Sequence, residues 1–394
     1  MKRIILISSS YPLSPEETFN AGVLAREVAL GLKDQGHAVW VITPRKDRPI
    51  CDPQIPVLEF PWLGQDRELA TQPVHILNLF RFTSLLLSGA LHTKRLAHAI
   101  RADICFALWA IPSGALAYWA WRQCGIPYGV WVLGSDIWKR NQYPMGERLV
   151  CRVLFHAAFR IADGWGLAQE ASRIGGKPCG FLPSLRRLPL ETPPAILPPA
   201  KWRLVYVGRF EPQKGIDMLV EALCHLRREI SGGQIYLLGD GSLRGWVESR
   251  IASCDLGETV HILGYASPYQ VVAMMKAVDY LIIPSRLESI PLVFGDAIQC
   301  ELPVIATDVG DLGMLVRKSQ VGWVVDELSV GGLVRGLRHA LSSLEQRAFF
   351  RSNIQRLQKW FHYDRMIDNI SGLLNGARNE GELSKGLLEE LGEL

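Results

Sequence analysis

The sequence predicts an α/β protein made of two Rossmann-like domains that face each other across a deep cleft. Three observations carry this prediction. Short apolar runs alternate with amphipathic helical segments along the first half of the 394-residue chain, a proline-rich stretch follows, and the alternation then starts again. Alternating strands and helices are typical of doubly wound parallel sheets, and ligands usually bind between two such domains.

The first domain is expected over residues 1–190. Arg3–Ser9 is an isoleucine-rich run, which is typical of a strand buried on both faces. Asn20–Gln35 repeats apolar residues every fourth position, which indicates an amphipathic helix, and Ala38–Thr43 is expected to be the next strand. This unit predicts a right-handed parallel crossover. Further strands are expected at Ile104–Leu108, Tyr128–Leu133 and Gly164–Leu167.

Residues 191–201 contain four prolines and are expected to form an extended linker. A second domain is expected over residues 202–360, and a crossover helix with an acidic tail over residues 361–394. The strands of the second domain are expected at Arg203–Val207, Ile235–Leu238, Val260–Leu263, Tyr280–Ile283 and Pro303–Ala306. Its helices are expected at Met218–Glu229, Leu243–Ser253, Tyr269–Met275 and Leu292–Cys300.

The composition is that of a globular protein, since 48% of the residues are apolar and 21% are charged. No apolar run reaches the roughly 18 residues of a transmembrane helix, and the N-terminus lacks the cleavage pattern of a signal peptide. The eight cysteines lie at least 19 residues apart, and the nine histidines show no metal-binding spacing. We therefore expect no metal, no redox motif and a cytoplasmic location.

The strongest local signal spans Val205–Leu223. A strand ends at Gly208, Arg209 and Lys214 follow in a loop, and an amphipathic helix begins after them. Strand ends of open α/β sheets face the ligand crevice, so two cations in such a loop could clamp a diphosphate. The alternative is a solvated loop in which Arg209 pairs with Glu211.

The second signal spans Pro284–Ile298. A strand ends near Pro284, a loop holds Glu288, and a helix begins near Pro291. Amide groups at a helix start bind anions. Glu288 and Asp296 are about two helical turns apart, and two such carboxylates suit a ligand rich in hydroxyls. The alternative is that Glu288 caps the helix and Asp296 faces solvent.

Taken together, these motifs resemble retaining glycosyltransferases of the GT-B architecture, specifically family 4, the glycosyl transferases group 1. Five pieces occur in the family's order, at Gly208–Gly215, Leu238–Ser242, Ile262–Tyr265, Glu288 and Pro303–Asp311. The N-terminal half matches less densely, at Gln35–Thr43, Trp109–Gly114 and Gly134–Trp138. The resemblance implies two Rossmann-like domains, with the C-terminal helix packing back on the N-terminal domain.

The resemblance also implies roles for individual residues. Arg209 and Lys214 would hold the donor diphosphate, Glu288 would bind hydroxyls of the transferred sugar, and Asp136 would face the sugar and acceptor. Further donor contacts are implied for Gly22, Gly208, Gly239, Gly264, Tyr265, Ser289, Ile290, Pro291, Leu292 and Asp296, with the base near Leu263–Tyr265 and the ribose at Asp296.

Two residues depart from the family pattern. Asp296 stands where the family has a glutamate one methylene longer, so it either reaches the ribose directly or contacts it through a bridging water. Leu133 stands where the family often has a histidine, so a side-chain contact to the sugar is missing. The missing contact at Leu133 indicates a donor with a different hydroxyl pattern, a compensating residue elsewhere, or weaker catalysis.

The function implied is retaining transfer of a hexosyl group from a nucleotide sugar to an acceptor hydroxyl, in bacterial cell-surface polysaccharide or glycolipid synthesis. The nucleotide sugar is a substrate, and no cofactor, metal or nucleic acid is expected. One alternative is a nucleotide-sugar 2-epimerase of the same fold, and another is a catalytically weak nucleotide-sugar-binding protein. An NAD-dependent oxidoreductase is disfavoured, because neither first loop carries the G-x-G-x-x-G pattern.

Charge is unevenly placed along the chain. Residues 1–190 carry 22 Lys and Arg against 14 Asp and Glu, a balance of +8, whereas the remainder carries 21 against 25, a balance of −4. This excess indicates either an anionic partner or ordinary surface variation. The helix-prone segment Val74–Ala99 combines apolar residues with Arg81, Lys94 and Arg95. It either docks on an anionic inner membrane near a lipid-linked acceptor or is a core helix with charged edges, and the core interpretation is preferred.

Two sets of residues bear on the membrane-docking alternative, one apolar and one basic. The apolar ones are Leu77, Phe80, Leu85, Leu86 and Leu87, and further basic residues of this half are Lys139, Arg140, Arg148, Arg152, Arg186 and Arg187.

Overall fold

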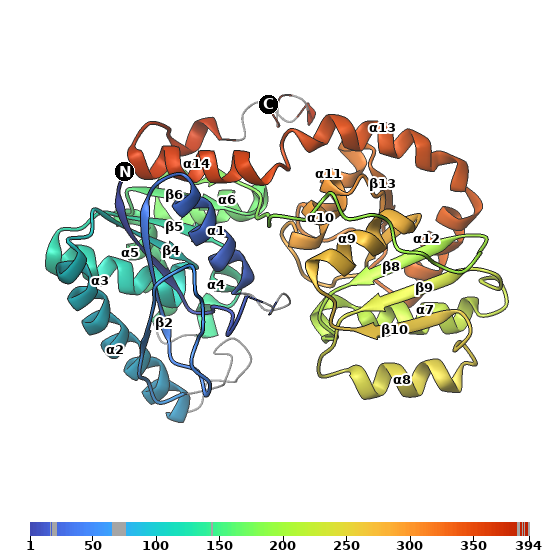
Figure 1. Ribbon diagram of the computed structural model, residues 1–394, viewed down its shortest axis with the longest axis horizontal. Coiled ribbons are helices and arrows are strands. Elements are labelled where there is room, and N and C mark those ends of the chain that lie inside the picture. The colour runs from blue at the N-terminus through green and yellow to red at the C-terminus, as the bar shows by residue number, and fades with distance from the viewer. Residues whose placement is uncertain are drawn as a thin grey trace. The chain divides into compact units, whose positions relative to one another are not determined.

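The computed structural model describes residues 1–15, 17, 22–64, 76–142, 145–383, 387, 389 and 391–392. The chain divides into two compact units, one formed by residues 1–183 with 364–394 and the other by residues 184–363. Each unit contains one parallel sheet, so the predicted α/β fold with two Rossmann-like domains is confirmed (Figure 1). The starts of two expected helices, Asn20 and Val74, lie outside the described residues.

The first unit is built on a seven-stranded sheet of order β3-β2-β1-β4-β5-β6-β7. Its strands are β1 Arg3–Ser8, β2 Ala38–Pro44, β3 Val57–Phe60, β4 Ile104–Leu108, β5 Tyr128–Val132, β6 Phe159–Ala162 and β7 Gly180–Phe181. Its helices are α1 Val23–Asp34, α2 Ile76–Ile100, α3 Ala115–Cys124, α4 Ser135–Trp138, α5 Gly146–His156, α6 Trp165–Gly175 and α14 Tyr363–Asn375. Figure 1 shows α2, α3 and α5 to one side of this sheet and α1 to the other.

One predicted strand of this unit is wrong. Gly164–Leu167 was expected to be a strand, but helix α6 begins at Trp165, and the strand lies just before it as β6. The sequence hid β6 because Arg160 interrupts its apolar run. This arginine is 3% exposed, and its guanidinium donates to the carbonyls of Ala157 and Pro178. Burial with backbone partners removes the usual reason for a charged residue to stay outside a central strand.

The C-terminal helix packs back on the first unit, as the fold prediction stated. Gln35, at the end of α1, donates to Asp368 of α14, and His37 Nε2 lies 2.9 Å from Ser371 Oγ. The residues that follow α14 meet the edge strand β7, where a β-carbon on Gly180 would lie 2.3 Å from the carbonyl oxygen of Glu380. A covered edge strand is protected from pairing with another chain.

The second unit is built on a six-stranded sheet of order β10-β9-β8-β11-β12-β13. Its strands are β8 Arg203–Val207, β9 Gln234–Leu238, β10 Val260–Gly264, β11 Tyr280–Ile283, β12 Val304–Thr307 and β13 Gly322–Val325. Its helices are α7 Ile216–Leu226, α8 Arg244–Ser253, α9 Pro268–Ala277, α10 Leu292–Gln299, α11 Leu312–Ser319, α12 Val330–Ser342 and α13 Arg347–Gln358. The order of strands reverses between β8 and β11, which makes this pair the switch point where open α/β sheets bind ligands.

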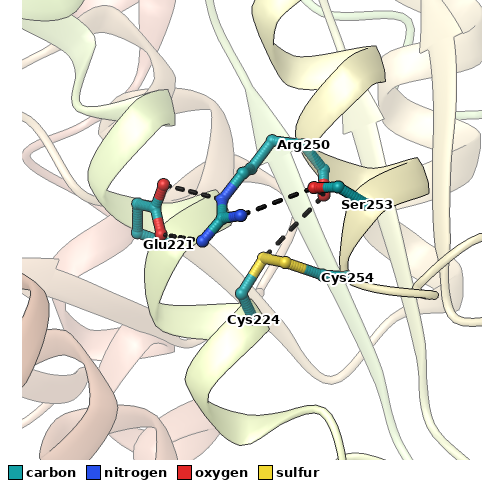
Figure 2. The surroundings of a disulfide bond; sticks show 5 residues. All are labelled: Glu221, Cys224, Arg250, Ser253 and Cys254. Carbon is teal, nitrogen blue, oxygen red and sulfur yellow. Dashed lines mark hydrogen bonds and ion pairs between the residues drawn. A yellow bond between two sulfur atoms is a disulfide. The ribbon is translucent and has the colours of Figure 1, made fainter.

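Two cysteines of the second unit form a disulfide that their spacing did not indicate. Cys224 on α7 and Cys254 at the end of α8 are 30 residues apart in sequence, and their Cα atoms lie 5.5 Å apart. Figure 2 shows this bond beside the ion pair of Arg250 with Glu221. The two helices pack side by side on one face of the sheet, so the fold brings together thiols that no local motif connects.

Candidate functional site

The loops after β8 and β11 meet at the switch point of the second sheet. Gly215 has φ +68°, and a β-carbon on it would lie 1.9 Å from the carbonyl oxygen of Pro284. The Arg286 amide donates to the carbonyl of Gln213 at 2.8 Å. The Arg286 guanidinium donates to both carboxylate oxygens of Asp217, at 2.6 and 2.7 Å. A glycine and an ion pair therefore fix two loops that are about 70 residues apart in sequence.

This contact places Lys214 beside Glu288. The ammonium group of Lys214 forms an ion pair with Glu288 Oε1, and Ser285 Oγ donates to the same oxygen at 3.2 Å. The Lys214 side chain is 26% exposed and the Glu288 side chain 12%, so both face partly into solvent. The structure thus brings together two of the three central residues predicted from the sequence.

Arg209 lies half-buried in the same loop as Lys214. The Arg209 carbonyl accepts a hydrogen bond from the Tyr206 hydroxyl at 2.8 Å, and the side chain of Phe210 is fully buried beneath the loop. Glu211 accepts hydrogen bonds from the amide and hydroxyl of Ser242 at 3.1 and 2.8 Å, which ties this loop to the one after β9. Contacts from Tyr206 on β8 and from the loop after β9 therefore fix the backbone around Arg209.

Glycines bring the remaining loops close together. A β-carbon on Gly239 would lie 1.9 Å from the carbonyl oxygen of Gly208, and the Gly239 amide donates to the Gly264 carbonyl at 2.7 Å. Gly310, with φ +53°, would clash in the same way with the carbonyl oxygen of Glu288 at 2.0 Å. At these positions the absence of a side chain sets the spacing of backbone against backbone.

The loop that precedes α10 carries the predicted contacts Ser289, Ile290, Pro291 and Leu292. Ser289 is 5% exposed, and its hydroxyl has no hydrogen-bond partner among the described residues. Pro291 stands at the N-cap of α10, and no side chain caps this helix. Glu288 is therefore not the helix cap, so that alternative is wrong. Among the first amides of α10, that of Phe294 donates to the Pro291 carbonyl at 2.9 Å.

Asp296 lies on α10 but does not face solvent, so that alternative is also wrong. Its carboxylate is 1% exposed and forms a two-pronged ion pair with Arg186, with Nε donating at 3.0 Å and Nη2 at 2.5 Å. Burial raises the pKa of Asp296, and the guanidinium opposes that rise. No local pattern in the sequence links Arg186 with Asp296, because 110 residues separate the two partners.

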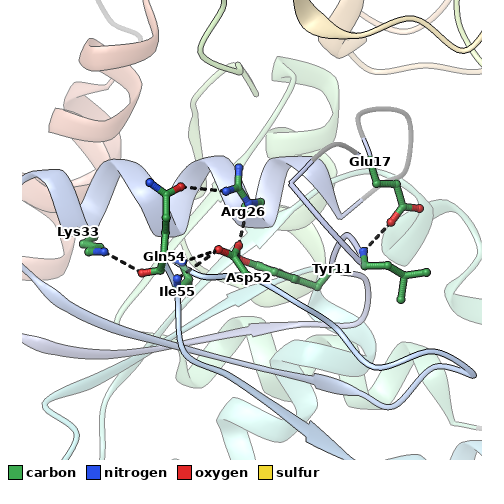
Figure 3. Close-up of polar contacts among 8 residues, drawn as sticks. Tyr11, Glu17, Arg26, Lys33, Asp52, Gln54 and Ile55 are labelled. Atoms are coloured by element: carbon green, nitrogen blue, oxygen red, sulfur yellow. Dashed lines mark hydrogen bonds and ion pairs between the residues drawn. The ribbon is translucent and has the colours of Figure 1, made fainter.

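Two predicted site residues belong to the first unit. A β-carbon on Gly22 would lie 2.5 Å from the backbone of Tyr11, so this glycine holds the start of α1 against the loop after β1. The side chain of Tyr11 is buried and donates to Asp52 at 2.9 Å, and Arg26 donates to the same carboxylate oxygen at 2.8 Å (Figure 3). Gly22 therefore has a structural reason to be glycine, whatever it contacts in a complex.

Asp136 is 2% exposed, between the loops that follow β4 and β5. Its carboxylate accepts hydrogen bonds from the amides of Ala110 at 2.5 Å and Leu133 at 3.3 Å. Burial raises the pKa of Asp136 to about 6, and these backbone hydrogen bonds act against the rise. In this structure the carboxylate joins two loops of the first unit, and its predicted contact with sugar and acceptor stays a prediction.

Two family matches cover most of the chain. The glycosyl transferase 4-like domain matches residues 21–179, and the glycosyl transferases group 1 family matches residues 193–357. An uncharacterized glycosyltransferase of Methanocaldococcus jannaschii is 28% identical over 166 residues, which is 42% of this chain and 46% of that protein. The putative teichuronic acid biosynthesis glycosyltransferase TuaC of Bacillus subtilis is 30% identical over 230 residues, 55% of this chain and 56% of that protein. The chain thus spans about half the length of these relatives.

Solved structures share the fold over nearly the whole chain. Sucrose-phosphate synthase from Thermosynechococcus elongatus aligns with a TM-score of 0.75 and 18% identity, covering 95% of this chain and 99% of that one. HepE of Anabaena, solved in complex with UDP-glucose, aligns with a TM-score of 0.70 and 16% identity, covering 95% and 100%. With both domain families matched in order and this fold, the chain belongs to the group 1 glycosyltransferases of the GT-B architecture.

Proposed function

We propose that this protein transfers a hexosyl group from a nucleotide sugar to an acceptor hydroxyl with retention of the anomeric configuration. The observation that carries the proposal is the pairing of Lys214 with Glu288 at the switch point of the second sheet, with Arg209 in the same loop. The naming of TuaC for teichuronic acid biosynthesis and the UDP-glucose bound by HepE support this reaction class. A role in synthesis of cell-surface polysaccharide or glycolipid belongs to the proposal.

The two cations act on the leaving group. When the bond between the anomeric carbon and the phosphate oxygen breaks, negative charge grows on the nucleoside diphosphate, and Arg209 and Lys214 stabilise that charge. The Ser289 hydroxyl and the amides of Leu292 and Val293, at the start of α10, add donors to the phosphate oxygens. These groups carry the charge without a bound metal, so we propose that turnover persists in the presence of a chelator.

Glu288 serves two partners in turn. Without donor, its carboxylate holds the Lys214 ammonium in place. With donor, the phosphate takes over Lys214, and Glu288 accepts hydrogen bonds from sugar hydroxyls. The acceptor hydroxyl then attacks the face that the phosphate leaves and passes its proton to the departing phosphate oxygen. Front-face attack retains the configuration at the anomeric carbon.

The acceptor side belongs to the first unit, where α2 presents an unusual outward face. The 25 residues of α2 include no Asp or Glu. Phe82 and Leu85 are buried, whereas four large apolar residues face solvent, with exposures of 42% for Leu79, 64% for Phe80, 63% for Leu87 and 47% for Leu91. Lys94 and Arg95 follow on the same helix. We propose that this face rests on an anionic bilayer and gives the first unit access to a lipid-linked acceptor.

No described helix is long and apolar enough to cross a membrane. Co-sedimentation with vesicles that contain anionic lipid tests the peripheral contact. Binding at low salt that weakens at high salt, and is lost in Leu87→Asp, supports it. Leu328→Asp, at an exposed leucine of the second unit, serves as the control. An equal loss of binding in this control, or no binding of wild type at low salt, contradicts the proposal.

The catalytic proposal is tested in two stages. A thermal-shift panel of UDP-, GDP- and ADP-sugars identifies the donor, because a ligand at about 100 times its Kd adds roughly 2.7 kcal/mol of stability. Turnover is then measured for Lys214→Ala, where loss of one charge-stabilising donor is expected to lower kcat about 10²- to 10³-fold. Lys201→Ala removes an exposed lysine at the opposite end of β8 and serves as the control.

Three outcomes contradict parts of this proposal. Near-normal kcat in Lys214→Ala removes the assigned role of that residue. A product with inverted anomeric configuration, read by NMR, excludes retention. Formation of an epimeric nucleotide sugar without any acceptor favours the 2-epimerase alternative instead.

A further inference from the structure

The glycines at the strand ends of the second sheet are of two kinds. At Gly239, Gly241 and Gly310 a β-carbon would come within 2.7 Å of backbone atoms of a neighbouring loop. Gly264 differs, because its β-carbon would meet only Nη1 of Arg244, at 3.9 Å. The first kind lets loops pack together, whereas Gly264 borders open space at the end of β10.

Strand β10 ends in an irregularity beside this space. Ile262 pairs with Leu237 and Gly264 pairs with Leu238, so Leu263 has no partner residue on β9. Such bulges redirect side chains and are common next to ligand sites. The Leu263 side chain is 48% exposed, so the end of β10 offers an apolar side chain next to a bare backbone.

Arg244, the first residue of α8, is held in place beside Gly264. Its Nε donates to Glu248 at 2.5 Å, and its Nη1 lies 3.5 Å from Asp240. These are the partners of its guanidinium within the described part of the chain, and they leave the two N–H groups of Nη2 available. The side chain is 33% exposed. Two carboxylates thus hold the guanidinium beside Gly264, and Nη1 is the atom nearest to that glycine.

The strand order places this space where a nucleoside would extend. The cations Arg209 and Lys214 follow β8, Glu288 follows β11 on one side, and Gly264 ends β10 two strands away on the other side. Two strand spacings are about 10 Å, which is comparable with the length of a ribose and its base. A donor with its sugar at Glu288 and its diphosphate at the cations would carry its base to Gly264.

We propose that Arg244 recognises the base of the donor and selects uracil or guanine over adenine, an inference that rests on the proposed function. A guanidinium only donates hydrogen bonds. Guanine presents two neighbouring acceptors and uracil presents carbonyl oxygens, whereas adenine places a donor amino group beside its acceptor. Leu263 and the bare backbone of Gly264 give the flat base an apolar surface.

The test compares binding of UDP, GDP, ADP and pyrophosphate by isothermal titration calorimetry. Wild-type protein is expected to bind UDP or GDP at least about tenfold more tightly than ADP, and Arg244→Ala is expected to lower that ratio about tenfold to a hundredfold. Arg244→Lys keeps the charge but loses the fork, so it is expected to lower the ratio as well. Pyrophosphate affinity is expected to stay the same in both variants.

Two further variants sharpen the test. Gly264→Asn tolerates the left-handed backbone at φ +72° but fills the space, so it is expected to weaken UDP or GDP binding and to leave pyrophosphate binding unchanged. Arg338→Ala removes a surface arginine that is paired with Glu229 in a similar way, and it is expected to change no affinity.

The outcomes separate this inference from the proposed function. A wild-type preference for ADP, or an unchanged nucleotide ratio in Arg244→Ala, overturns the role of Arg244 and leaves nucleotide binding intact. Failure of the wild-type protein to bind any nucleoside diphosphate or pyrophosphate overturns the proposed function, and the role of Arg244 falls with it.

Discussion

Gly310→Ala is expected to lower kcat by displacing the loop of Glu288, although Gly310 has no functional side chain. Gly310 has φ +53°, and an added β-carbon would lie 2.0 Å from the carbonyl oxygen of Glu288 and 3.2 Å from that of Ser289. Real β-carbons essentially never come closer than 3.0 Å to such an atom, so the backbone at Glu288 must move by about 1 Å (3.0 − 2.0). A misplacement of about 1 Å can cost about 10²-fold in rate.

The stability cost of this change has two sources. The left-handed backbone costs a non-glycine residue roughly 1–2 kcal/mol, and forced packing typically adds roughly 1–3 kcal/mol. The assay measures kcat with the donor that the thermal-shift panel identifies, together with the thermal midpoint of the same preparation. The expected result is a folded protein with a Tm several degrees lower and kcat reduced about 10²-fold.

Two glycine controls separate strain from displacement. Gly36 has φ +83°, and a β-carbon added there would meet nothing within 4 Å, so Gly36→Ala tests the backbone cost alone. Gly257 has open space and no left-handed backbone, so Gly257→Ala is expected to be close to neutral. If Gly310→Ala loses no more activity than Gly36→Ala, the Glu288 loop does not depend on this close approach and the reasoning is refuted.

Three further changes test other features. Reduction of the Cys224–Cys254 disulfide, which joins positions 30 residues apart, is expected to lower the free energy of unfolding by about 3–4 kcal/mol. Dithiothreitol should therefore lower the Tm of wild type more than that of the double serine variant, and equal shifts in the two proteins contradict this expectation. Burial lowers the pKa of His37, so the folded state keeps the imidazole neutral and loses stability as pH falls below about 6.5. The Tm of wild type should therefore fall relative to that of His37→Gln between about pH 7.5 and 5.5, and parallel curves would exclude this effect. Arg186→Leu is expected to cost about 3–5 kcal/mol, and adding Asp296→Leu should recover most of it; nucleotide affinity that disappears in the folded double variant would instead support the ribose contact predicted for Asp296.

Much of the fold could be predicted because it depends on local patterns. Strands Arg203–Val207, Ile104–Leu108 and Tyr280–Ile283 were predicted with the bounds that the structure shows, since each is a short apolar run between turn residues. Strand Phe159–Ala162 was missed because the buried Arg160 interrupts its apolar run. Periodicity records which residues are apolar, and it cannot record that a charged residue finds buried partners.

Some residues of the site could likewise be predicted from local patterns, whereas their partners could not. Arg209 and Lys214 could be placed from the sequence, because a strand end followed by a cationic loop and a helix is a local pattern. The sequence also predicted Glu288 and Asp296 to be a pair of carboxylates about two helical turns apart on one side of the element. It did not reveal that Glu288 stays partly exposed beside Lys214, whereas Asp296 is buried against Arg186.

The alternation of elements, the two-domain plan and the loops that hold the cations follow from the amino-acid sequence, because side-chain periodicity and turn residues act within a few positions. The partners of those residues depend on how the chain folds in three dimensions. The ion pairs of Glu288 and Asp296 join positions 74 and 110 residues apart, and the Cys224–Cys254 bond joins positions 30 apart. Such pairs depend on the order of strands in the sheet, which sets neighbours in space that no local pattern encodes.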